Sequence, residues 1–283
     1  MERELTDATA TERLDLARAG RDEAARLIAR VALAAGPAVM DEYSAGGPAR
    51  AKRDGSPVTA ADERAEAIIT ARLKILAPRI PLVAEEAAAA GKALEIAQRF
   101  FLVDPLDGTR EFIARNGEFT INIALIEAGA PIAGAVYAPA IGRLWFAGET
   151  AHLVEVPVGA DLPDPSAWRR LKTRPAPAAL VALASRSHAD PETEAFLAKL
   201  PIGERKSAGS SLKFCVIAEG NADVYPRFAP TMEWDTAAGD AVLRAAGGIV
   251  LRMDGKPLDY GKIGVGLRNG GFVAWGDIDR PHR

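Results

Sequence analysis

The fold is decided by the stretch Phe101-Leu102-Val103-Asp104-Pro105-Leu106-Asp107-Gly108-Thr109. Its apolar first half predicts a buried strand, and Gly108-Thr109 predicts a tight turn into a new element. The carboxylates of Asp104 and Asp107 therefore stand at a strand end, beside a loop rich in backbone N–H groups. Hard oxygen ligands in such a place suit divalent cations and a phosphate group. The plainer interpretation is two turns in succession, Asp-Pro and then Asp-Gly.

The segments on either side predict a protein of mixed helices and strands. Residues 11–43 have apolar residues near helical spacing, and Gly36-Pro37 is expected to interrupt or kink that helix. Residues 119–126, 132–137 and 144–146 have strand character and predict an antiparallel meander. The remaining expected elements are a helix at 58–76, a strand at 82–84, a loose connection at 87–91, a strand at 180–184, helices at 190–200 and 210–219, a strand at 223–225, a helix at 234–246 and a hairpin at 249–260.

A proline-rich segment predicts the boundary between two subdomains. Residues 157–177 carry five prolines among 21 residues, which is typical of a linker. We expect residues 1–157 to form an N-terminal α+β subdomain that contains most of the metal ligands. Residues 178–283 are expected to form a C-terminal α/β subdomain that supplies Asp235 and substrate contacts, with the functional cleft between the two.

The charge balance argues against a nucleic-acid partner. The 283 residues carry a net charge of −3, and the charged residues are interspersed rather than gathered in a basic patch. A protein with this balance needs a local source of positive charge to bind a phosphate substrate, and a bound metal ion supplies it.

The single cysteine and the hydropathy pattern predict a cytoplasmic protein. Cys215 has apolar neighbours and is expected to be a buried structural thiol rather than a nucleophile. One cysteine allows no intramolecular disulfide, which suits a reducing compartment. The first residues, Met-Glu-Arg-Glu, show no secretory signal, and no segment reaches the roughly 18 apolar residues that span a bilayer.

Four acidic sites share one context, because each lies where a strand or turn gives way to another element. They are Asp62, Glu85 with Glu86, the pair Asp104 and Asp107, and Asp235. Taken alone, an aspartate at a helix start is usually an N-cap, and capping is the favoured interpretation of Asp235 by itself. Four such sites in one chain favour a shared metal cluster instead.

Three segments resemble the signatures of the inositol monophosphatase superfamily of metal-dependent, lithium-sensitive phosphatases. They are Glu85-Glu86, residues 104–109 and residues 233–239. Further segments resemble the bacterial 3′(2′),5′-bisphosphate nucleotidase (CysQ) branch of that superfamily. They are residues 56–62, 111–119, 185–188, 209–215 and 225–228. The similarity runs from about residue 36 to residue 274. Residues 87–90 and Asn269-Gly270-Gly271-Phe272 depart from the pattern of the family.

The resemblance implies an α+β fold, a layered α-β-α-β-α sandwich, with two Mg²⁺ ions at the cleft. The implied metal ligands are Glu85, Asp104, the carbonyl of Leu106, Asp107 and Asp235. Asp104 would bridge the two ions, and a third, looser ion would lie near Glu85 and Asp62. Two cations about 4 Å apart stabilise both the attacking water and the leaving oxygen of an in-line displacement.

The resemblance also implies catalytic and substrate-binding roles. Asp62 and Thr109, together with the ligand Glu85, would orient and deprotonate the attacking water. The implied substrate contacts are Leu106, Asp107, Gly108, Thr109, Ser210, Lys213, Arg227 and Asp235.

Several neighbouring residues have two interpretations each. Lys52, Lys213 and Arg227 are candidate partners of a second, non-reacting phosphate, and an ordinary surface ion pair is the alternative for each. His188 is either a nucleotide contact or a plain surface histidine. Glu86 either steadies Glu85 or is a solvated charge, and Trp234 is expected in the core rather than stacked on a base.

The activity implied by the resemblance is removal of the 3′-phosphate from adenosine 3′,5′-bisphosphate to give AMP. A second implied substrate is 3′-phosphoadenylyl sulfate, which places the protein in sulfur assimilation. One alternative is the same chemistry on an inositol or sugar phosphate, and another is a non-catalytic sensor of phosphometabolites. The expected partner is a small nucleotide bisphosphate, bound by a monomer or homodimer. Relatives of this branch are described at the cytoplasmic face of the inner membrane, but no amphipathic basic helix in the sequence would drive such binding.

Overall fold

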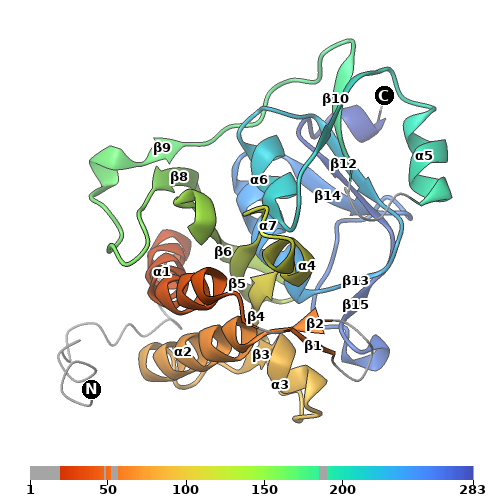
Figure 1. Cartoon of the computed structure of the whole chain (residues 1–283). Helices are drawn as coiled ribbons and strands as arrows, with labels where there is room; N and C mark the ends of the chain where they lie inside the picture. Colours follow the sequence, from red (N-terminus) through yellow and green to blue (C-terminus); the bar gives the residue numbers. More distant parts are fainter. Residues whose placement is uncertain (1–19, 48, 52–56, 185–189, 283) are drawn as a thin grey trace.

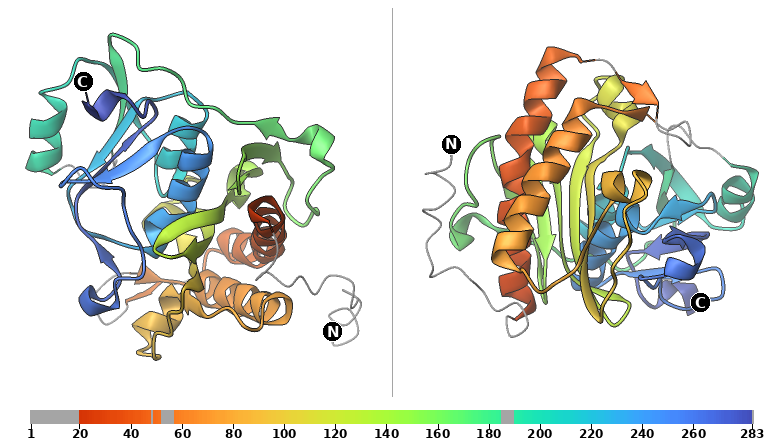
Figure 2. Two further views of the ribbon diagram at one scale, coloured as in Figure 1. Left: turned by 180° about the vertical axis from the view of Figure 1, so that it is seen from behind. Right: turned by 90° about the horizontal axis from the view of Figure 1, so that it is seen from below.

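Helices and sheets alternate in five layers in the computed structural model, which describes residues 20–47, 49–51, 57–184 and 190–282 (Figure 1). The helices are α1 (Arg21–Ala45), α2 (Ala60–Leu76), α3 (Glu85–Ala89), α4 (Thr109–Ile113), α5 (Pro191–Leu197), α6 (Leu212–Ala218) and α7 (Trp234–Ala245). The two long N-terminal helices lie side by side across one face of the larger sheet (Figure 2). This arrangement confirms the predicted α-β-α-β-α sandwich.

The larger sheet contains the predicted meander. Its order is β3 (Leu82–Ala84), β4 (Arg99–Asp107), β5 (Thr120–Glu127), β6 (Ala130–Ala138), β7 (Arg143–Ala147), β8 (Ala151–Glu155) and β9 (Arg169–Arg170). Only the edge pair β3 and β4 is parallel, and the pairs from β4 to β9 are antiparallel. Strand β4 is apolar from Phe100 to Val103 because helices cover both of its faces. Phe101 and Val103 join the core under α1 and α2, whereas Phe100 and Leu102 join the core under α7.

The smaller sheet has its own two faces. Its order is β11 (Ile202–Ser207), β10 (Leu180–Ala184), β12 (Val224–Arg227), β16 (Phe272–Trp275) and β14 (Ile249–Arg252). Side chains alternate along its strands, so that Val224 and Val273 pack with Leu197 of α5. Tyr225 and Phe272 point the other way, into the core that contains α6 and α7.

Helix α7 lies between the two sheets and contacts both. It packs on β5 and β6 of the larger sheet and on β14 of the smaller one. Short pairs complete the structure: β1 (Arg50–Ala51) with β2 (Pro57–Val58), and β13 (Thr231–Met232) with β15 (Arg268–Asn269). Strand β13 of the second pair stands immediately before α7 in the chain.

The predicted interruption of the first helix is wrong. Helix α1 continues through Pro37 to Ala45, and the part of the prediction before residue 20 lies outside the described residues. Proline removes one helical hydrogen bond, but buried residues stand on both sides of it, Leu33 and Ala35 before and Val39 after. Packing of this face on the sheet stabilises the helix, as tertiary contacts generally do for helices in proteins.

Several further elements differ from the sequence expectation, and strands such as β8 and β16 were not predicted. Residues 85–89 form the short helix α3 rather than a loose connection. Strand β11 was not predicted, because as an exposed edge strand it lacks the apolar alternation that indicates a strand. In place of the hairpin expected at 249–260, the segment has one isolated β-bridge, between Leu251 and Pro257. Strand β14 pairs with β16 instead.

The division into two subdomains stays a prediction. The proline-rich segment 157–177 connects β8 to β10, and β9 within it belongs to the larger sheet. Cys215 and Trp234 are buried in the core, as predicted.

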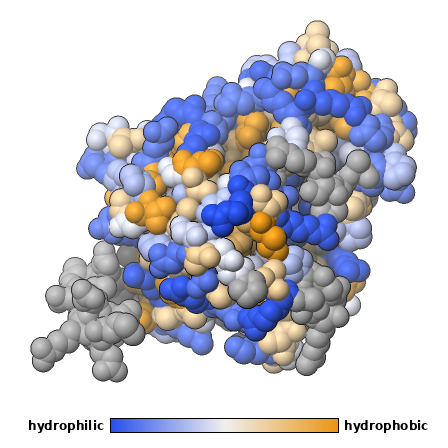
Figure 3. Space-filling view, in the orientation of Figure 1, coloured by the Kyte–Doolittle hydropathy of each residue, from blue (hydrophilic) through white to orange (hydrophobic). Residues whose placement is uncertain are grey.

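The outer surface offers no extended apolar face in the view of Figure 3, where hydrophobic residues stand in small groups among hydrophilic ones. Within the described part of the chain, the helices are too short or too polar to cross a bilayer.

The contact between α6 and α7 leaves no room for a side chain at Gly239. A Cβ atom there would lie 2.5 Å from Cδ2 of Phe214 and 2.9 Å from its Cβ. We therefore expect Gly239→Ala to destabilise the protein by about 1–3 kcal/mol, the usual cost of overpacking a core. Gly264→Ala is the matched control, because a Cβ at Gly264 would meet open space. Urea unfolding measures both, and equal stability of the two variants would contradict the expectation.

Candidate active site

The corner at the end of β4 is shaped by an irregularity in strand pairing. Asp104 pairs with Asn122 and Asp107 with Thr120, so β4 contains one more residue than β5 over this interval. Such a bulge bends a strand and re-aims its side chains, and it is common beside active sites. Here it brings the side chains of two aspartates to one end of the sheet.

Asp107 is held by donors from both halves of the chain. Its Oδ2 atom accepts hydrogen bonds from Ser210 Oγ at 2.6 Å, from the Ser211 backbone N–H at 2.7 Å and from Asn122 Nδ2 at 3.4 Å. Ser211 Oγ in turn donates to Asn122 Oδ1 at 2.8 Å, and Thr120 Oγ1 contacts the hydroxyls of both serines. The orientation of this carboxylate is therefore fixed through one oxygen by three donors.

A glycine allows the two halves to approach so closely. A Cβ atom at Gly209 would lie 2.7 Å from the carbonyl oxygen of Glu118, a distance at which backbone would have to move. The Gly209 N–H donates to Glu118 Oε2 at 2.8 Å. Segment 208–211 thus lies against the loop that follows α4, within reach of Asp107.

Asp62 has a structural and a site-facing oxygen. Its Oδ2 atom accepts from Thr59 N and Thr59 Oγ1, both at 2.7 Å, in a capping box that begins α2. Its Oδ1 atom is 3.3 Å from Thr109 Oγ1, which is also 3.3 Å from the Leu106 carbonyl oxygen. The structure therefore brings the predicted catalytic pair, Asp62 and Thr109, into contact.

Glu85 comes to the corner by way of the parallel edge strand. Ala84 of β3 pairs with Val103 of β4, so the next residues along the two strands, Glu85 and Asp104, lie side by side. Burial, followed by the charges of Glu85, Asp107 and Asp235, raises the pKa of Asp104 well above its usual range. The predicted ligands therefore form one electrostatically coupled group.

Asp235 completes this group from the start of α7. Burial and the charge of Asp107 raise the pKa of Asp235 to about 6, against hydrogen bonds from Thr231 and Met232. Its Oδ2 atom accepts from the Thr231 hydroxyl and from the Met232 N–H at 3.0 Å. Capping was the interpretation favoured for Asp235 alone, and it is wrong, because the N-cap position belongs to Glu233.

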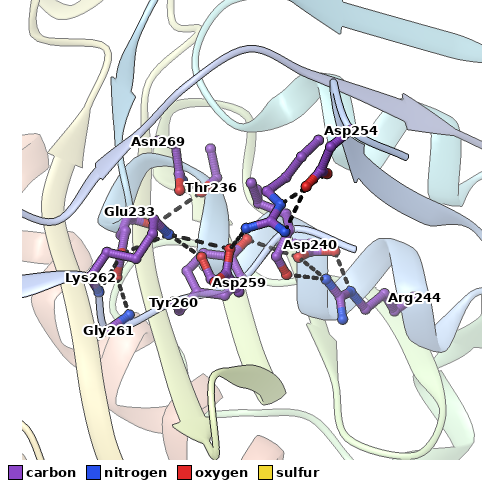
Figure 4. A network of polar contacts seen from close by, with 12 residues as sticks. Glu233, Thr236, Asp240, Arg244, Asp254, Asp259, Tyr260, Gly261, Lys262 and Asn269 are labelled. Carbon is purple, nitrogen blue, oxygen red and sulfur yellow. Dashed lines mark hydrogen bonds and ion pairs between the residues drawn. The ribbon is translucent and has the colours of Figure 1, made fainter. Parts of the chain in front are cut away.

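A buried network of polar contacts holds the start of α7 in place (Figure 4). Glu233 is fully buried and accepts from the Gly261 N–H at 2.6 Å, from the Lys262 N–H at 2.9 Å and from Lys262 Nζ at 2.8 Å. Further along the helix, Asp240 accepts two hydrogen bonds from Arg244 and one from the Tyr260 hydroxyl. These contacts join α7 to segment 258–262 and leave Asp235 little freedom to move.

A cavity of about 260 Å³ opens beside the carboxylates. The predicted site residues that line it are Glu85, Asp107, Gly108, Thr109, Ser210, Lys213, Arg227 and Asp235. Asp62, Asp104 and Leu106 are buried next to it. The structure thus brings these predicted site residues together in one place, while Lys52 and His188 lie outside the described residues.

Two cations face this cavity in different ways. Lys213 is buried and donates from Nζ to the carbonyl oxygens of Ala208 at 3.0 Å and Ser210 at 2.7 Å. Arg227 is near enough to the carboxylates that the charges of Tyr225, Asp235 and Asp107 raise its pKa despite the opposing effect of burial. Lys213 therefore shapes the serine turn, and Arg227 offsets part of the negative charge.

The donor set fits a hard divalent cation. Several buried carboxylates within reach of one another are costly to bury unless a cation compensates them, and carboxylate and carbonyl oxygens are the ligands that Mg²⁺ takes. In the part of the chain that the structure describes, no three acidic, histidine or cysteine side chains already stand in the arrangement of a metal site. Hydrogen bonds hold Asp107 and Asp235 to their neighbours instead.

The sequence interpretation missed several residues that support the site. Thr120 and Asn122 are polar positions two residues apart in an otherwise apolar strand, and that spacing places both on one face. Thr59 is the first member of a capping box with Asp62. These patterns were available in the sequence, whereas the contribution of Ser211 depends on how the two halves meet.

The chain belongs to the inositol monophosphatase family, whose model matches residues 21–276. This family is magnesium-dependent in general. The chain is 46% identical over 235 residues to the 3′(2′),5′-bisphosphate nucleotidase CysQ of Escherichia coli strain K12, which covers 82% of this chain and 92% of that protein. It is 48% identical over the same length to the protein of that name in Shigella flexneri, with the same coverage.

Solved structures agree with the fold. The crystal structure of CysQ from Bacteroides thetaiotaomicron has a TM-score of 0.74 and 40% sequence identity, and the match covers 89% of this chain and 97% of that one. Inositol monophosphatase from Anabaena sp. PCC 7120 has a TM-score of 0.70 at 22% identity, covering 92% and 93% of the two chains. The second match concerns the fold alone.

The network around Asp107 predicts the effect of removing one hydroxyl. Ser211→Ala takes a donor from the buried Asn122 Oδ1 atom, and an unsatisfied buried acceptor costs about 1–3 kcal/mol. Urea unfolding measures this loss. The exposed Ser44 on α1 is the control, and its replacement by Ala is expected to change stability by less than about 0.5 kcal/mol. A Ser211→Ala protein as stable as this control would contradict the assignment.

Proposed function

We propose that this chain is a Mg²⁺-dependent 3′(2′),5′-bisphosphate nucleotidase that removes the 3′-phosphate of adenosine 3′,5′-bisphosphate to give AMP and phosphate. The proposal depends on one observation above all, the convergence of Glu85, Asp104, Asp107 and Asp235 beside a cavity. It is supported by the 46% identity to a nucleotidase of that name over most of both chains. A protein that only sensed phosphometabolites would not need such a cluster.

The residues that would hold Mg²⁺ are Glu85, Asp104, the Leu106 carbonyl, Asp107 and Asp235. Two ions are part of the proposal, with a third near Glu85 and Asp62. When bound, the ions supply positive charge that stabilises the phosphoryl group and the leaving oxygen. Phosphate monoesters are among the slowest bonds to hydrolyse without catalysis, so this charge is the main requirement of the reaction.

Asp62 and Thr109 would deprotonate and orient the attacking water. Because Thr59 occupies Oδ2 of Asp62, the proton from water would be accepted at Oδ1, the atom that faces Thr109. The Thr109 hydroxyl would orient the water through its oxygen while it donates to Asp62 or to the Leu106 carbonyl. Water then displaces the ribose 3′-oxygen from phosphorus, and no covalent phosphoenzyme is required.

The remaining lining residues would bind the nucleotide. Gly108, Thr109 and Ser210, which line the cavity, would surround the reacting phosphate, and Arg227 and Lys213 would contact the second phosphate. Arginine suits a two-point phosphate contact. The proposal includes 3′-phosphoadenylyl sulfate as a second substrate, with the cytoplasm as the location and a monomer or homodimer as the working state. Its closest rival is hydrolysis of an inositol or sugar phosphate.

Replacing the central carboxylate tests the reaction. Asp104→Asn removes the charge shared by both implied ions, and we expect phosphate release from adenosine 3′,5′-bisphosphate to fall by about 10²-fold or more. The assay measures released phosphate with Mg²⁺ and with chelator. Asp161→Asn is the control, since Asp161 is exposed on the proline-rich segment and its replacement is expected to leave the rate unchanged. Full activity of Asp104→Asn, or activity that survives the chelator, would refute the mechanism.

The choice of substrate is tested by a direct comparison. The wild-type chain is expected to hydrolyse adenosine 3′,5′-bisphosphate with a higher kcat/KM than inositol 1-phosphate. Faster turnover of the inositol ester would assign the chain to the rival activity. Tight nucleotide binding without phosphate release would favour the non-catalytic sensor.

Arg227 tests the binding of the second phosphate. We expect Arg227→Ala to raise KM for adenosine 3′,5′-bisphosphate by about tenfold or more, the loss of one charge-assisted hydrogen bond. The KM for adenosine 3′-monophosphate, which lacks the 5′-phosphate, should change much less. Equal changes for the two substrates would show that Arg227 supports the carboxylates rather than the second phosphate.

A further inference from the structure

Helix α3, which begins with Glu85, has little packing to hold it in place. It consists of Glu85–Ala89, and none of its residues is buried. It follows β3, a three-residue edge strand. A turn of helix this short is not stable by itself, so its position has to come from specific contacts.

The side of α3 that faces α2 is packed only in part, because Ala87 lies half-buried against the core that contains α2 and a cavity lies beside it. A cavity of about 380 Å³ lies there, lined by Ala87 and Ala88 of α3, by Thr70 and Lys74 of α2, and by residues 78–84 and 92–95. Helix α3, which begins with the predicted metal ligand Glu85, therefore lies beside a cavity along part of its length.

Glu66 at the edge of this cavity binds the first turn of α3 directly. Its Oε2 atom accepts the Glu86 N–H at 2.7 Å, and its Oε1 atom accepts the Ala87 N–H at 2.9 Å. The Glu66 side chain is on α2 and only 9% exposed. The first N–H groups of a helix have no partner within that helix, and here one carboxylate satisfies two of them in succession.

Two bonds from one carboxylate fix both the position and the rotation of the first turn. Together with the pairing of β3 and β4, Glu66 therefore sets the direction in which Glu85 leaves the backbone. Glu66 follows Asp62 by four residues, so both acidic side chains project from the same face of α2. Helix α2 thus places Asp62 at the corner and, through Glu66, holds the first turn of α3, which begins with Glu85.

We propose that Glu66 is a positioning residue for Glu85: it does not touch the substrate, and it determines metal affinity by holding the first turn of α3. This inference rests on the proposed function, because Glu85 matters only as a ligand. Partners that orient metal ligands typically change metal affinity by about 10–100-fold when they are removed. The effect is expected on metal binding rather than on the chemistry at saturating Mg²⁺.

The test compares Glu66→Ala and Glu66→Gln with Glu63→Ala. Glu63 is the matched control, because it is on the same helix but exposed, with Arg50 as its partner. Binding of Mn²⁺ to the protein without substrate, followed by electron paramagnetic resonance, gives a readout independent of activity. We expect Glu66→Ala to raise the Mn²⁺ dissociation constant by about 10–100-fold and the half-activating Mg²⁺ concentration in parallel. Glu66→Gln keeps one acceptor oxygen and should lie between, while Glu63→Ala should match the wild type.

The outcomes separate this inference from the proposed function. A folded Glu66 variant that binds Mn²⁺ and responds to Mg²⁺ like the wild type overturns the role of Glu66. If Glu66→Ala does not fold, as judged by circular dichroism, the Glu66→Gln protein decides the question. A wild-type chain that binds Mn²⁺ but hydrolyses no phosphate ester overturns the proposed function, while weaker Mn²⁺ binding by the variants would still support the positioning role. A wild-type chain that binds no Mn²⁺ overturns both.

Discussion

Mutual repulsion among buried carboxylates is the constraint on which the rest of this structure depends. Asp104 lies within the electrostatic influence of Glu85, Asp107 and Asp235 in a place that water scarcely reaches. Such an arrangement is unfavourable without compensation, and the fold supplies it with hydrogen-bond donors. Thr59 binds Asp62, Ser210 binds Asp107 and Thr231 binds Asp235. Each donor lowers the cost of its own carboxylate and at the same time fixes its direction.

The layered architecture brings these pairs together from distant parts of the sequence. The edge pair β3 and β4 places Glu85 beside Asp104, and the N-terminus of α2 adds Asp62. Helix α7, packed between the two sheets, adds Asp235 from the other side. The network of Glu233 and Lys262 (Figure 4) joins the start of this helix to segment 258–262. Separate segments of the chain thus build one site.

Much of this could be predicted from the sequence, and what was missed has physical reasons. The buried strand β4, the meander after it and the acidic positions all have local patterns; the structure confirms the strand and the meander and brings the acidic positions together. Strand β11 was missed because an exposed edge strand has no apolar periodicity. The predicted interruption of α1 at Pro37 was wrong because packing of the helix outweighs the hydrogen bond that proline removes. The short helix α3 depends on Glu66, a contact between residues 20 positions apart. Ser211 and Asn122 meet only when the two halves come together, and no local pattern describes such a contact.

The hydrogen bonds of Asp107 also bear on which ion the site accepts. The donors Ser210, Ser211 and Asn122 all meet Oδ2, which restrains rotation of the carboxylate about its Cβ–Cγ bond and leaves Oδ1 as the atom that would bind a cation. A monodentate carboxylate suits the small octahedral shell of Mg²⁺, whereas Ca²⁺ favours seven or eight ligands and readily takes both oxygens of one group. If Asp107 binds the ions as proposed, the serine pair on segment 208–211 would favour magnesium over calcium, although neither serine is among the proposed ligands.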